Sequence, residues 1–482
     1  MVLTLLWTVP AIGCFVVWTM PQAAARRAAL LFSAVLFAFS LWLLVPYSAQ
    51  TGLLRLRETA GPSTLGIQYR LAVDGIGLAL CWLTALLTML AFAASPERLP
   101  AGYWAAFLGL EAALFGVFTA QNLFYFYLFW DLSLIPMFFI IGLWGSDRRR
   151  HASLKFILYT FLGSMSLLIG VVALVVLHHA ATGVWTWDIE SLRATPIGQK
   201  GAAFCFAAAA LGFAVKIPIV PAHNWLPDAH TEAPMAGSVL LAGSMLKMGV
   251  YGFLHILLPV FPTLSRHAFP IFAALGAVNV LYGALCAMAQ TDLKRLVAYT
   301  SVSHLGFCVL GLFSLTAAGV VGGSLQMINH GLSTGGLFLL VGMLYERTHR
   351  RGLGDFGALA TQAPAFAFFF GVILLSSIGL PGLNGFVGEF LSLAGLAKVS
   401  IPFAALALLG TVFAAAYGLP AYQKVFWAPA GAGSVTEKVD DLSVRERAVL
   451  WSLVGLIVWL GVYPKPMLDL ISPSIAAVSV RR

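Results

Sequence analysis

The chain has 482 residues, of which 60% are hydrophobic and only 10% are charged. Soluble domains carry about 25% charged residues, so this composition excludes an ordinary soluble enzyme and indicates an integral membrane protein. The formal net charge of +9 does not indicate nucleic acid as a partner, because the basic residues lie mostly in short loops and form no patch with interleaved aromatic residues.

Apolar runs follow one another along the whole chain, and many reach the ~20 residues needed to cross a bilayer. Hydropathy and helix-breaking residues predict an all-α polytopic membrane protein with about fourteen transmembrane helices. The connections are short, so we expect residues 1–482 to form a single membrane domain. The predicted spans are 3–20, 28–46, 73–94, 104–120, 123–145, 154–180, 201–221, 229–259, 268–289, 295–315, 319–345, 365–397, 402–427 and 448–463.

The first run, residues 3–20, lacks the basic start and the small-residue cleavage site of a signal peptide, so we expect it to stay in the protein as a span. The loops after odd-numbered spans hold 16 of the 28 Lys and Arg residues, whereas the opposite side holds 10. Basic loops favour the cytoplasmic side of a membrane. This bias predicts that both termini lie on the non-cytoplasmic side.

Spans seven and twelve are both interrupted by Pro or Gly, and each carries one ionisable residue near the interruption. The seventh reads GFAVKIPIVPAHNWLP and contains Lys216, and the twelfth reads SSIGLPGLNGFVGEF and contains Glu389. Paired interrupted helices in corresponding positions are typical of inverted-repeat transporters. The predicted organisation is therefore N-terminal helices over 1–100, one five-helix repeat over 104–259, a second, inverted repeat over 265–427, and a C-terminal loop with the last helix over 428–482.

A set of ionisable residues lies at membrane depth. A charged side chain at a helix centre costs about 2.5–3.5 kcal/mol on insertion scales, so such residues usually face the bundle interior and mark a path for ions or protons. The main candidates are Asp131, Lys216, Lys247, His304, His330 and Glu389, and the further candidates are Glu111, His223 and His230.

The chemistry of these groups suits protons. Burial disfavours the charged form of a lysine and a nearby carboxylate favours it, so a changing Asp131–Lys216 distance would make Lys216 take up and release a proton. Lys247 lies on the next span and could receive that proton through ordered water. Imidazole exchanges protons near neutral pH, so the histidines of spans ten and eleven could relay them to Glu389. One chain through all of these groups is our hypothesis.

Each candidate also has a purely structural interpretation. Asp131 and Lys216 could form only a structural ion pair, and Lys247 could extend its ammonium group to the membrane interface. The histidines of spans ten and eleven could be hydrogen-bonded packing residues. Glu111 has no identified partner and could make a helix-packing hydrogen bond. The prediction therefore depends on the set rather than on any single residue.

Several weaker motifs do not support other chemistry. GLGDFG at 352–357 fits a nucleotide-binding pattern, but it lies in a loop and not between a strand and a helix. His223, His230 and Glu232 do not have zinc-ligand spacing, and we expect them to make hydrogen bonds at the end of the broken span. The five cysteines form no CxxC pair, so no iron–sulfur cluster or zinc site is predicted in this chain.

Several segments resemble the antiporter-like subunits of respiratory complex I, the proton-pumping NADH–quinone oxidoreductase. These segments are FWDLSLIPMFFIIGLWG, FAVKIPIVPAHNWLPDAHTEAPMAGSVLLAGSMLKMGVYG, DLKRLVAYTSVSHLGF, INHGLSTGGLFLLVGMLYERT and LPGLNGFVGEFL. The resemblance covers roughly residues 70–430 and includes the related Mrp-type Na⁺/H⁺ antiporter subunits and the membrane subunits of energy-converting hydrogenases. The glutamate at position 389 resembles the M-type branch of this family. The other branches have a lysine at the corresponding position.

The resemblance implies a fourteen-helix fold with two inverted five-helix repeats, in the inner membrane of a bacterium. It implies that the six main candidates form the proton path, and that redox chemistry in other subunits drives it. NADH, FMN, iron–sulfur clusters and quinone would then be bound by partner membrane and peripheral subunits, and this chain would bind no cofactor or metal.

Two positions depart from the family pattern. The carboxylate of the fifth helix is usually glutamate, and Asp131 is shorter by one methylene, so its pairing with Lys216 could be looser or bridged by water. Where an arginine is common after KMGVYGFL, this chain has His255. Three other functions remain as alternatives: a cation/proton antiporter subunit of Mrp type, a membrane subunit of an energy-converting hydrogenase, and a structural membrane anchor that carries no protons.

Overall fold

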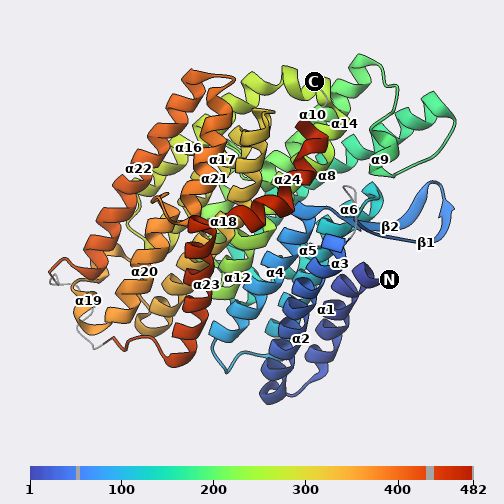
Figure 1. Ribbon diagram of the computed structural model, residues 1–482. Coiled ribbons are helices and arrows are strands. Elements are labelled where there is room, and N and C mark those ends of the chain that lie inside the picture. Colours follow the sequence, from blue (N-terminus) through green and yellow to red (C-terminus); the bar gives the residue numbers. More distant parts are fainter. Residues whose placement is uncertain (50–54, 430–438, 480–482) are drawn as a thin grey trace.

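The computed structural model describes residues 1–49, 55–429 and 439–479. The chain is a bundle of helices, most of which stand side by side (Figure 1). This arrangement confirms the predicted all-α membrane architecture in its main features. Lys438, which the charge count places in a loop, lies outside the described residues.

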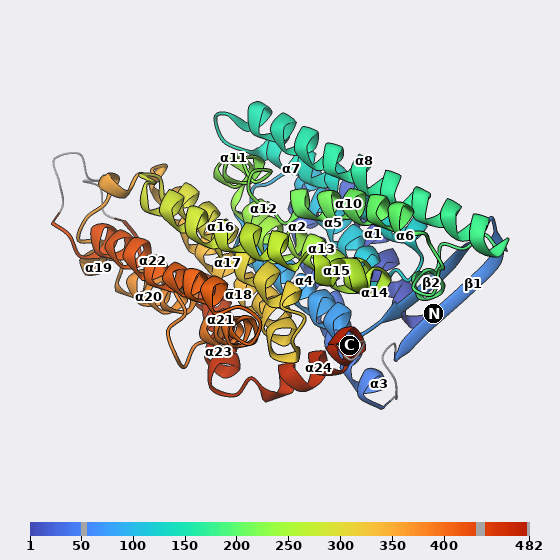
Figure 2. The same cartoon turned by 90° about the horizontal axis from the view of Figure 1, so that it is seen from above.

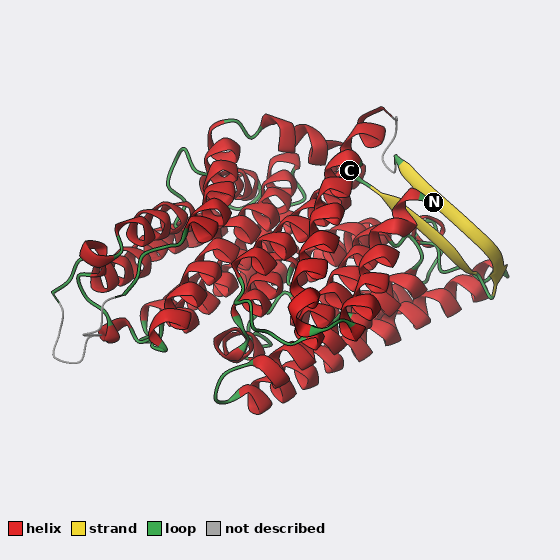
Figure 3. Cartoon of the chain, turned by 90° about the horizontal axis from the view of Figure 1, so that it is seen from below, coloured by secondary structure: helices red, strands yellow, loops and turns green. Residues whose placement is uncertain are grey.

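The N-terminal part contains a β-hairpin that the hydropathy pattern does not predict. Its strands pair antiparallel and lie at the edge of the bundle beside the N-terminus (Figure 3). Glu58 on the first strand accepts hydrogen bonds from the backbone N–H groups of Leu3 and Thr4 at 2.6 and 3.0 Å, which satisfies donors that a helix start leaves free. The elements are α1 (Val2–Thr19), α2 (Gln22–Trp42), α3 (Leu44–Ala49), β1 (Leu56–Thr64) and β2 (Ile67–Val73).

The next elements lead to the first broken helix. A long helix, α8, runs along one edge of the bundle, and α10 packs against it (Figure 2). After α10 the chain leaves helical geometry until α11 begins. The elements are α4 (Gly75–Ala94), α5 (Ala101–Thr119), α6 (Leu123–Leu132), α7 (Leu134–Trp144), α8 (Arg149–Thr182), α9 (Ile189–Leu192), α10 (Gln199–Lys216) and α11 (Trp225–Glu232).

The predicted eighth span differs from the helix found there. We expect it to begin near residue 229, but α11 ends at Glu232 and the following helix begins at Met235, because Pro234 separates the two. This helix contains two π-helical turns, which leave some backbone groups without their usual partners. Its parts are α12 (Met235–Leu240), η1 (Leu241–Met245), α13 (Lys247–Gly252), η2 (Phe253–Leu257) and α14 (Leu258–Val260).

The remaining helices complete the second half of the bundle. The predicted twelfth span is two short helices, α20 and α21, with a break between them. The elements are α15 (Pro262–His267), α16 (Phe269–Met288), α17 (Leu293–Phe313), α18 (Ala317–Thr348), η3 (Leu353–Asp355), α19 (Leu359–Gln362), α20 (Pro364–Ser377), α21 (Asn384–Ala397), α22 (Ile401–Phe426), α23 (Val444–Val462) and α24 (Lys465–Ser479).

Among the described residues, 11 helices are long and apolar enough to cross a membrane. A twelfth candidate joins α23 to the first part of α24, Lys465–Ile475, with a bend of 70°. Each of the fourteen predicted spans falls on one or more helices, but α10 and the α20–α21 pair are not among those that pass the length and hydropathy test. The count of fourteen and the inverted repeat therefore stay predictions.

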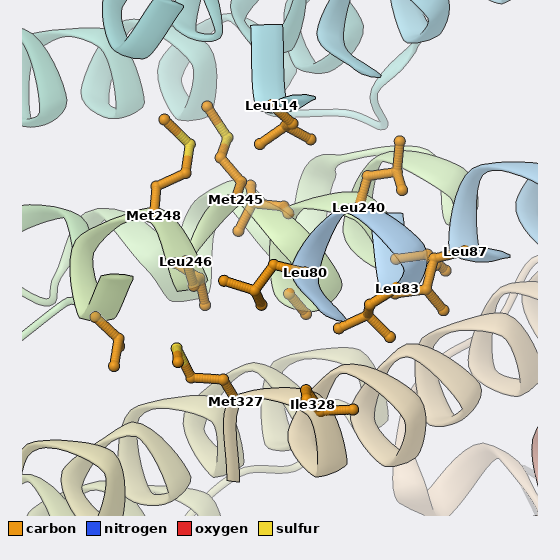
Figure 4. Packing of buried hydrophobic residues seen from close by; sticks show 14 of the residues in the cluster. Leu80, Leu83, Leu87, Leu114, Leu240, Met245, Leu246, Met248, Met327 and Ile328 are labelled. Atoms are coloured by element: carbon orange, nitrogen blue, oxygen red, sulfur yellow. The ribbon is translucent and has the colours of Figure 1, made fainter. Parts of the chain in front are cut away.

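The centre of the bundle is formed by the helix over Met235–Val260 together with α17 and α18, whose apolar stretches are wholly buried. Figure 4 shows how the residues around η1 pack: Met245 and Met248 extend toward Leu114 of α5, while Leu80 and Leu83 of α4 lie between this helix and α18. Dry packing of this kind excludes water, so polar groups inside it must find partners within the protein.

Candidate functional site

The break after α10 is built by side chains from neighbouring helices. Asn279 on α16 accepts a hydrogen bond from the Val220 N–H at 2.7 Å and donates to the Pro218 carbonyl at 3.3 Å. The Trp225 indole donates to the Val215 carbonyl at 3.0 Å. These bonds satisfy backbone groups that the prolines free, so the non-helical segment is stable at membrane depth.

Lys216 is the last residue of α10 and is buried at this break. Its ammonium group has no hydrogen-bond partner in the described part of the chain, and it lies 5.4 Å from the centre of the Trp130 ring. A cation over an aromatic face is attracted to it, but this compensates only part of the cost of burying a charge. Lys216 is therefore a group whose charge state depends on what approaches it.

Asp131 lies on α6, one residue after Trp130, and is held from the side of α8. The Ser164 hydroxyl donates a short hydrogen bond to its carboxylate, and the Tyr127 hydroxyl oxygen lies 3.2 Å from the same Ser164 oxygen. Within the described residues no direct ion pair joins Asp131 to Lys216, whose ammonium group has no hydrogen-bond partner there. The structure therefore places them as a separated pair rather than as a contact ion pair.

Lys247 lies in the centre of the bundle, directly after the π-helical turn η1. A π-helical turn leaves a carbonyl without its usual intrahelical donor. Here the Lys247 ammonium group donates a short hydrogen bond to the Ala242 carbonyl of that turn. Its second partner is Nδ1 of His330 on α18, at 2.6 Å. Lys247 is fully buried, so it does not extend to the membrane interface.

The two histidines continue from Lys247 toward the second broken helix. The rings of His330 and His304 lie 5.7 Å apart between their centres. His304 contacts Oε1 of Glu389 through Nδ1 at 3.1 Å and the Ser377 hydroxyl through Nε2 at 3.2 Å. Lys247, His330, His304 and Glu389 therefore form one file of ionisable groups from the bundle centre to α21.

A small polar cavity lies beside this file. It is bordered by both histidines, by Gln326 and Ser377, and by other hydroxyl and amide side chains. Its volume of about 10 Å³ is at the lower limit of the space that can hold one water molecule. The free Nε2 of His330 and the unpaired oxygen of Gln326 both need a partner. One water in this cavity would close the gap between the two imidazoles.

The second break brings Glu389 close to the backbone. Gly379 has a φ of +78°, and a Cβ atom at this position would lie 2.8 Å from Oε2 of Glu389. Only glycine fits both the left-handed conformation and the close approach. The Ser376 hydroxyl donates to the Asn384 side chain at 2.5 Å, and Asn329 donates to the Asn384 carbonyl at 2.6 Å. Polar side chains thus hold the break open beside Glu389.

The three further candidates do not join this file by hydrogen bonds. Glu111 on α5 is fully buried, and its carboxyl oxygens have no partner among the described residues; the nearby Thr88 hydroxyl donates to Thr84 instead. His223 packs edge-on against Tyr282, with 5.2 Å between the ring centres. His230 stacks on Phe338 at 4.4 Å, and neither of its ring nitrogens has a partner in the described part of the chain.

Sequence reasoning missed the side chains that position the candidates. Ser164 and Tyr127 hold Asp131, Ser377 and Gln326 contact the His304–Glu389 pair, and Asn279 closes the first break. An uncharged polar residue inside an apolar span is the only sequence signal for such a role. That signal is weak, because Ser, Thr and Gln also bond to their own helix backbone.

The chain was compared with known proteins. Residues 120–414 match the profile of the family described as NADH:quinone oxidoreductase/Mrp antiporter, transmembrane. NADH-quinone oxidoreductase subunit M of Rhodobacter capsulatus is 40% identical over 468 residues, covering 94% of this chain and 90% of the relative. The subunit of the same name from Escherichia coli strain K12 is 38% identical over 497 residues, covering 97% and 96%.

Two solved structures extend this likeness to the whole fold. A chain of respiratory complex I from Thermus thermophilus with bound NADH superposes with a TM-score of 0.91 at 33% identity and covers 99% of both chains. A chain of the Mrp complex from Dietzia sp. gives a TM-score of 0.89 at 21% identity, with 99% and 98% covered, which shows a shared fold. The chain therefore belongs to the NADH:quinone oxidoreductase/Mrp antiporter transmembrane family.

Proposed function

We propose that this chain is the proton-translocating membrane subunit of a complex I-type NADH–quinone oxidoreductase. The observation that carries this proposal is the file from Lys247 through His330 and His304 to Glu389, four ionisable groups that are all buried in the bundle. A purely structural anchor has no need for such a file, because buried ionisable groups are costly wherever apolar residues would pack equally well.

The geometry supports a relay with the following steps. Lys247 in its ammonium form donates a proton to Nδ1 of His330, and the other nitrogen of that ring faces the water-sized cavity. His304 accepts from this cavity and passes the proton to Glu389, with which it is already in contact. When the next group takes its proton, each imidazole is left with its remaining proton on the opposite nitrogen, so it must return to its first tautomer before the next transfer.

We assign the separated pair Asp131 and Lys216 to the coupling between proton transfer in this chain and redox chemistry in the partner subunits. When Asp131 is near, the ammonium form of Lys216 is favoured, and when it is far the neutral amine is favoured. Redox chemistry elsewhere in the assembly would drive this change. We assign NADH, FMN, the iron–sulfur clusters and quinone to the partner subunits, and we place no redox site in this chain.

We place the protein in a bacterial inner membrane, with both termini on the non-cytoplasmic side. The charge count supports this orientation, because 16 of the 28 basic residues fall in the opposite loops. Whole-cell labelling of a tag at either terminus with a membrane-impermeant reagent tests it. Labelling only after the cells are opened would contradict the proposed orientation.

The decisive experiment uses the assembled complex in proteoliposomes. Glu389→Gln keeps the shape of the side chain but cannot carry a negative charge, so we expect electron transfer without the normal rate of proton pumping. Glu97→Gln is the matched control, because Glu97 is exposed and surface ion pairs contribute little. Normal pumping by Glu389→Gln would support a structural anchor, and pumping that requires Na⁺ would support an antiporter subunit.

A further inference from the structure

A larger cavity lies on the side of the bundle, at the end opposite the basic loops. Its volume of about 530 Å³ falls within the range of about 300–1,000 Å³ that is typical of small-molecule sites. Its lining comes from α2, α3, α4, α23 and α24, and from the residue before β1. Trp82 lies on the second turn of α4 and Trp459 on the last turn of α23, so the cavity is at the level where these helices leave the membrane.

The bend between α23 and α24 shapes this cavity. The chain turns by 70° after α23, and α24 then packs against α4 (Figure 2). The helices α2 and α23 also pack against α4, and the cavity lies over α4 between them. Leu41 on α2 and Trp459 on α23 are both exposed, so the cavity opens toward the lipid that surrounds the bundle.

The inner wall of the cavity is apolar. It is formed by Phe37 of α2, Ala79 of α4 and Leu456 of α23. Each of these residues lies between one and two turns inside the end of its helix, which places the wall within the hydrocarbon layer. Their side chains have no hydrogen-bonding groups, so this part of the cavity favours hydrocarbon over water.

The rim of the cavity carries the charges. The guanidinium carbon of Arg55 lies 4.7 Å from the centre of the Tyr47 ring, and the Nη1 group of Arg55 donates to the Tyr47 carbonyl at 3.4 Å. Asp469 also lines the cavity, and the Lys465 ammonium group lies 2.6 Å from its carboxylate. Two cations therefore meet one carboxylate, and the charge that remains at the rim is positive.

An apolar wall below a positive rim fits an amphiphile with a phosphate group. A guanidinium group presents several N–H donors in a fixed fork, so Arg55 can bind a phosphate through two of them while it remains over Tyr47. Basic side chains together with Trp and Tyr are the usual neighbours of lipid headgroups at a membrane surface. Acyl chains touch any groove on the side of a membrane protein, and the cation at the rim is what distinguishes a bound lipid from bulk lipid.

We propose that this cavity binds one phospholipid, with its phosphate at Arg55 and one acyl chain against Phe37, Ala79 and Leu456. The site goes beyond the proposed function, because none of its residues belongs to the file or to the Asp131–Lys216 pair. The recognised chemistry is a phosphate joined to hydrocarbon, which phosphatidylglycerol and phosphatidylethanolamine share.

The test uses the assembled complex, purified in detergent and depleted of lipid. Phosphatidylglycerol that carries a photoreactive diazirine at the end of one acyl chain is added, and the labelled peptides are identified by mass spectrometry. We expect label on the wall segments of α2, α4 and α23. Unlabelled phosphatidylglycerol or phosphatidylethanolamine should displace it, whereas a diacylglycerol with the same chains should not, because it has no phosphate.

A first variant addresses the phosphate. Arg55→Met removes the charge and keeps much of the side-chain volume. Hydrogen bonds between charged groups are the stronger ones, so we expect at least about tenfold less label at the wall. Arg55→Lys keeps the charge and should retain most of the label. Arg57→Met is the matched control, because Arg57 is exposed on β1 and does not line the cavity.

A second variant addresses the acyl chain. Ala79→Phe fills the apolar part of the cavity and leaves Arg55 unchanged, so it should also prevent labelling. Its control is Ala38→Phe, which adds the same volume at an exposed position of α2 outside the cavity.

Loss of label in both Arg55→Met and Ala79→Phe, with both controls labelled normally, supports the site. Unchanged labelling in either variant, or equal displacement by diacylglycerol, means that the groove holds only bulk lipid and overturns the proposal. Absence of label in the unchanged complex means that another subunit fills the cavity, which overturns it too. Should Ala79→Phe not assemble, Arg55→Met and the displacement decide. None of these measurements involves pumping, so their failure leaves the proposed function as it stands.

Discussion

Two regions of the bundle hold their ionisable groups in different ways. In the file that runs from the bundle centre to α21, Lys247 and Glu389 are each within bonding distance of a histidine, and the two histidine rings lie 5.7 Å apart. At the first broken helix, Lys216 has no hydrogen-bond partner among the described residues, and Asp131 is held by Ser164 instead. The first region is a prearranged file, and the second is a pair of groups that are not in contact.

This difference indicates that the two regions have different functions, which we call a division of labour: one transfers protons, and the other controls that transfer. A prearranged file passes protons without moving its side chains, whereas a separated pair can change its electrostatic interaction when either partner moves. Coupling to a distant reaction requires a part with two arrangements that differ in energy. The Asp131–Lys216 pair has the freedom for this, so we expect it to control the file rather than to duplicate it.

The largest expected effect comes from removing one ionisable group of the file. Lys247→Met removes the group that contacts both His330 and the π-helical turn, and methionine fills the same volume. We expect proton pumping to fall by more than about a hundredfold, the scale of a lost proton-transfer group. Pumping in proteoliposomes measures it. Lys398→Met, at an exposed position, should pump normally.

A smaller effect is expected in the Asp131–Lys216 pair. Asp131→Ala removes the partner charge of Lys216 but breaks no direct ion pair, so the loss should be that of an electrostatic coupling, about tenfold. Asp131→Glu restores the carboxylate with a longer reach and should pump within about threefold of the unchanged protein. A loss as large as that of Lys247→Met would contradict the division of labour.

Glycines of the second break test how tightly Glu389 is held. Gly379→Ala adds a Cβ 2.8 Å from Glu389 Oε2 and also strains a φ of +78°. Gly382→Ala strains a φ of +91° but meets no atom within 4 Å. Strain of this kind costs about 1–3 kcal/mol, so both should lower the thermal unfolding temperature. Only Gly379→Ala should also slow pumping; equal pumping by the two would show that Glu389 is loosely held.

A milder change loosens Asp131. Ser164→Ala removes its short hydrogen bond, and we expect a stability loss of about 0.5–1.5 kcal/mol with pumping lowered a few-fold. Ser166→Ala, two residues along α8, removes instead a 2.9 Å bond to the Ala208 carbonyl. The Ser166 variant should change stability alone, as thermal unfolding and pumping rates together will show.

The smallest effect concerns Asp74, which lies outside both regions, just before the first residue of α4. Burial raises the pKa of its carboxyl above the ordinary value, despite a hydrogen bond from the Gly77 N–H at 2.7 Å. Because the folded state then binds the proton more tightly, this group costs stability as pH rises above its unfolded pKa. Asp74→Asn, which caps a helix equally well, should unfold at a slightly higher temperature at neutral pH and show no gain in acid.

Much of this organisation is predictable from sequence. The low charge fraction predicts a membrane bundle, and the prolines after Lys216 and the glycines before Glu389 predict the two broken helices. These signals are local, since a proline or an apolar run acts on its own segment. The set of ionisable residues is also visible locally, because each is conspicuous among apolar neighbours.

The contacts are not predictable in the same way. Lys247 and His330 are separated by 83 residues, and nothing in either segment indicates that their side chains meet. The hydropathy pattern does not predict the hairpin over Leu56–Val73, because this segment contains no long apolar run. It does not predict the π-helical turns either, because a π turn has the same apolar composition as an α turn.

The π-helical turn before Lys247 has a consequence for how this protein can change in length. A residue in an α-helix advances about 100° around the axis, and a π turn absorbs one residue more than an α turn. Deleting a single residue from Leu241–Met245 would convert the π turn into an α turn and keep Lys247 on the face that meets His330, whereas a deletion in a regular part of a helix would rotate everything after it by about 100°. The π-helical turn is therefore the place in this helix where the loss of one residue is best tolerated.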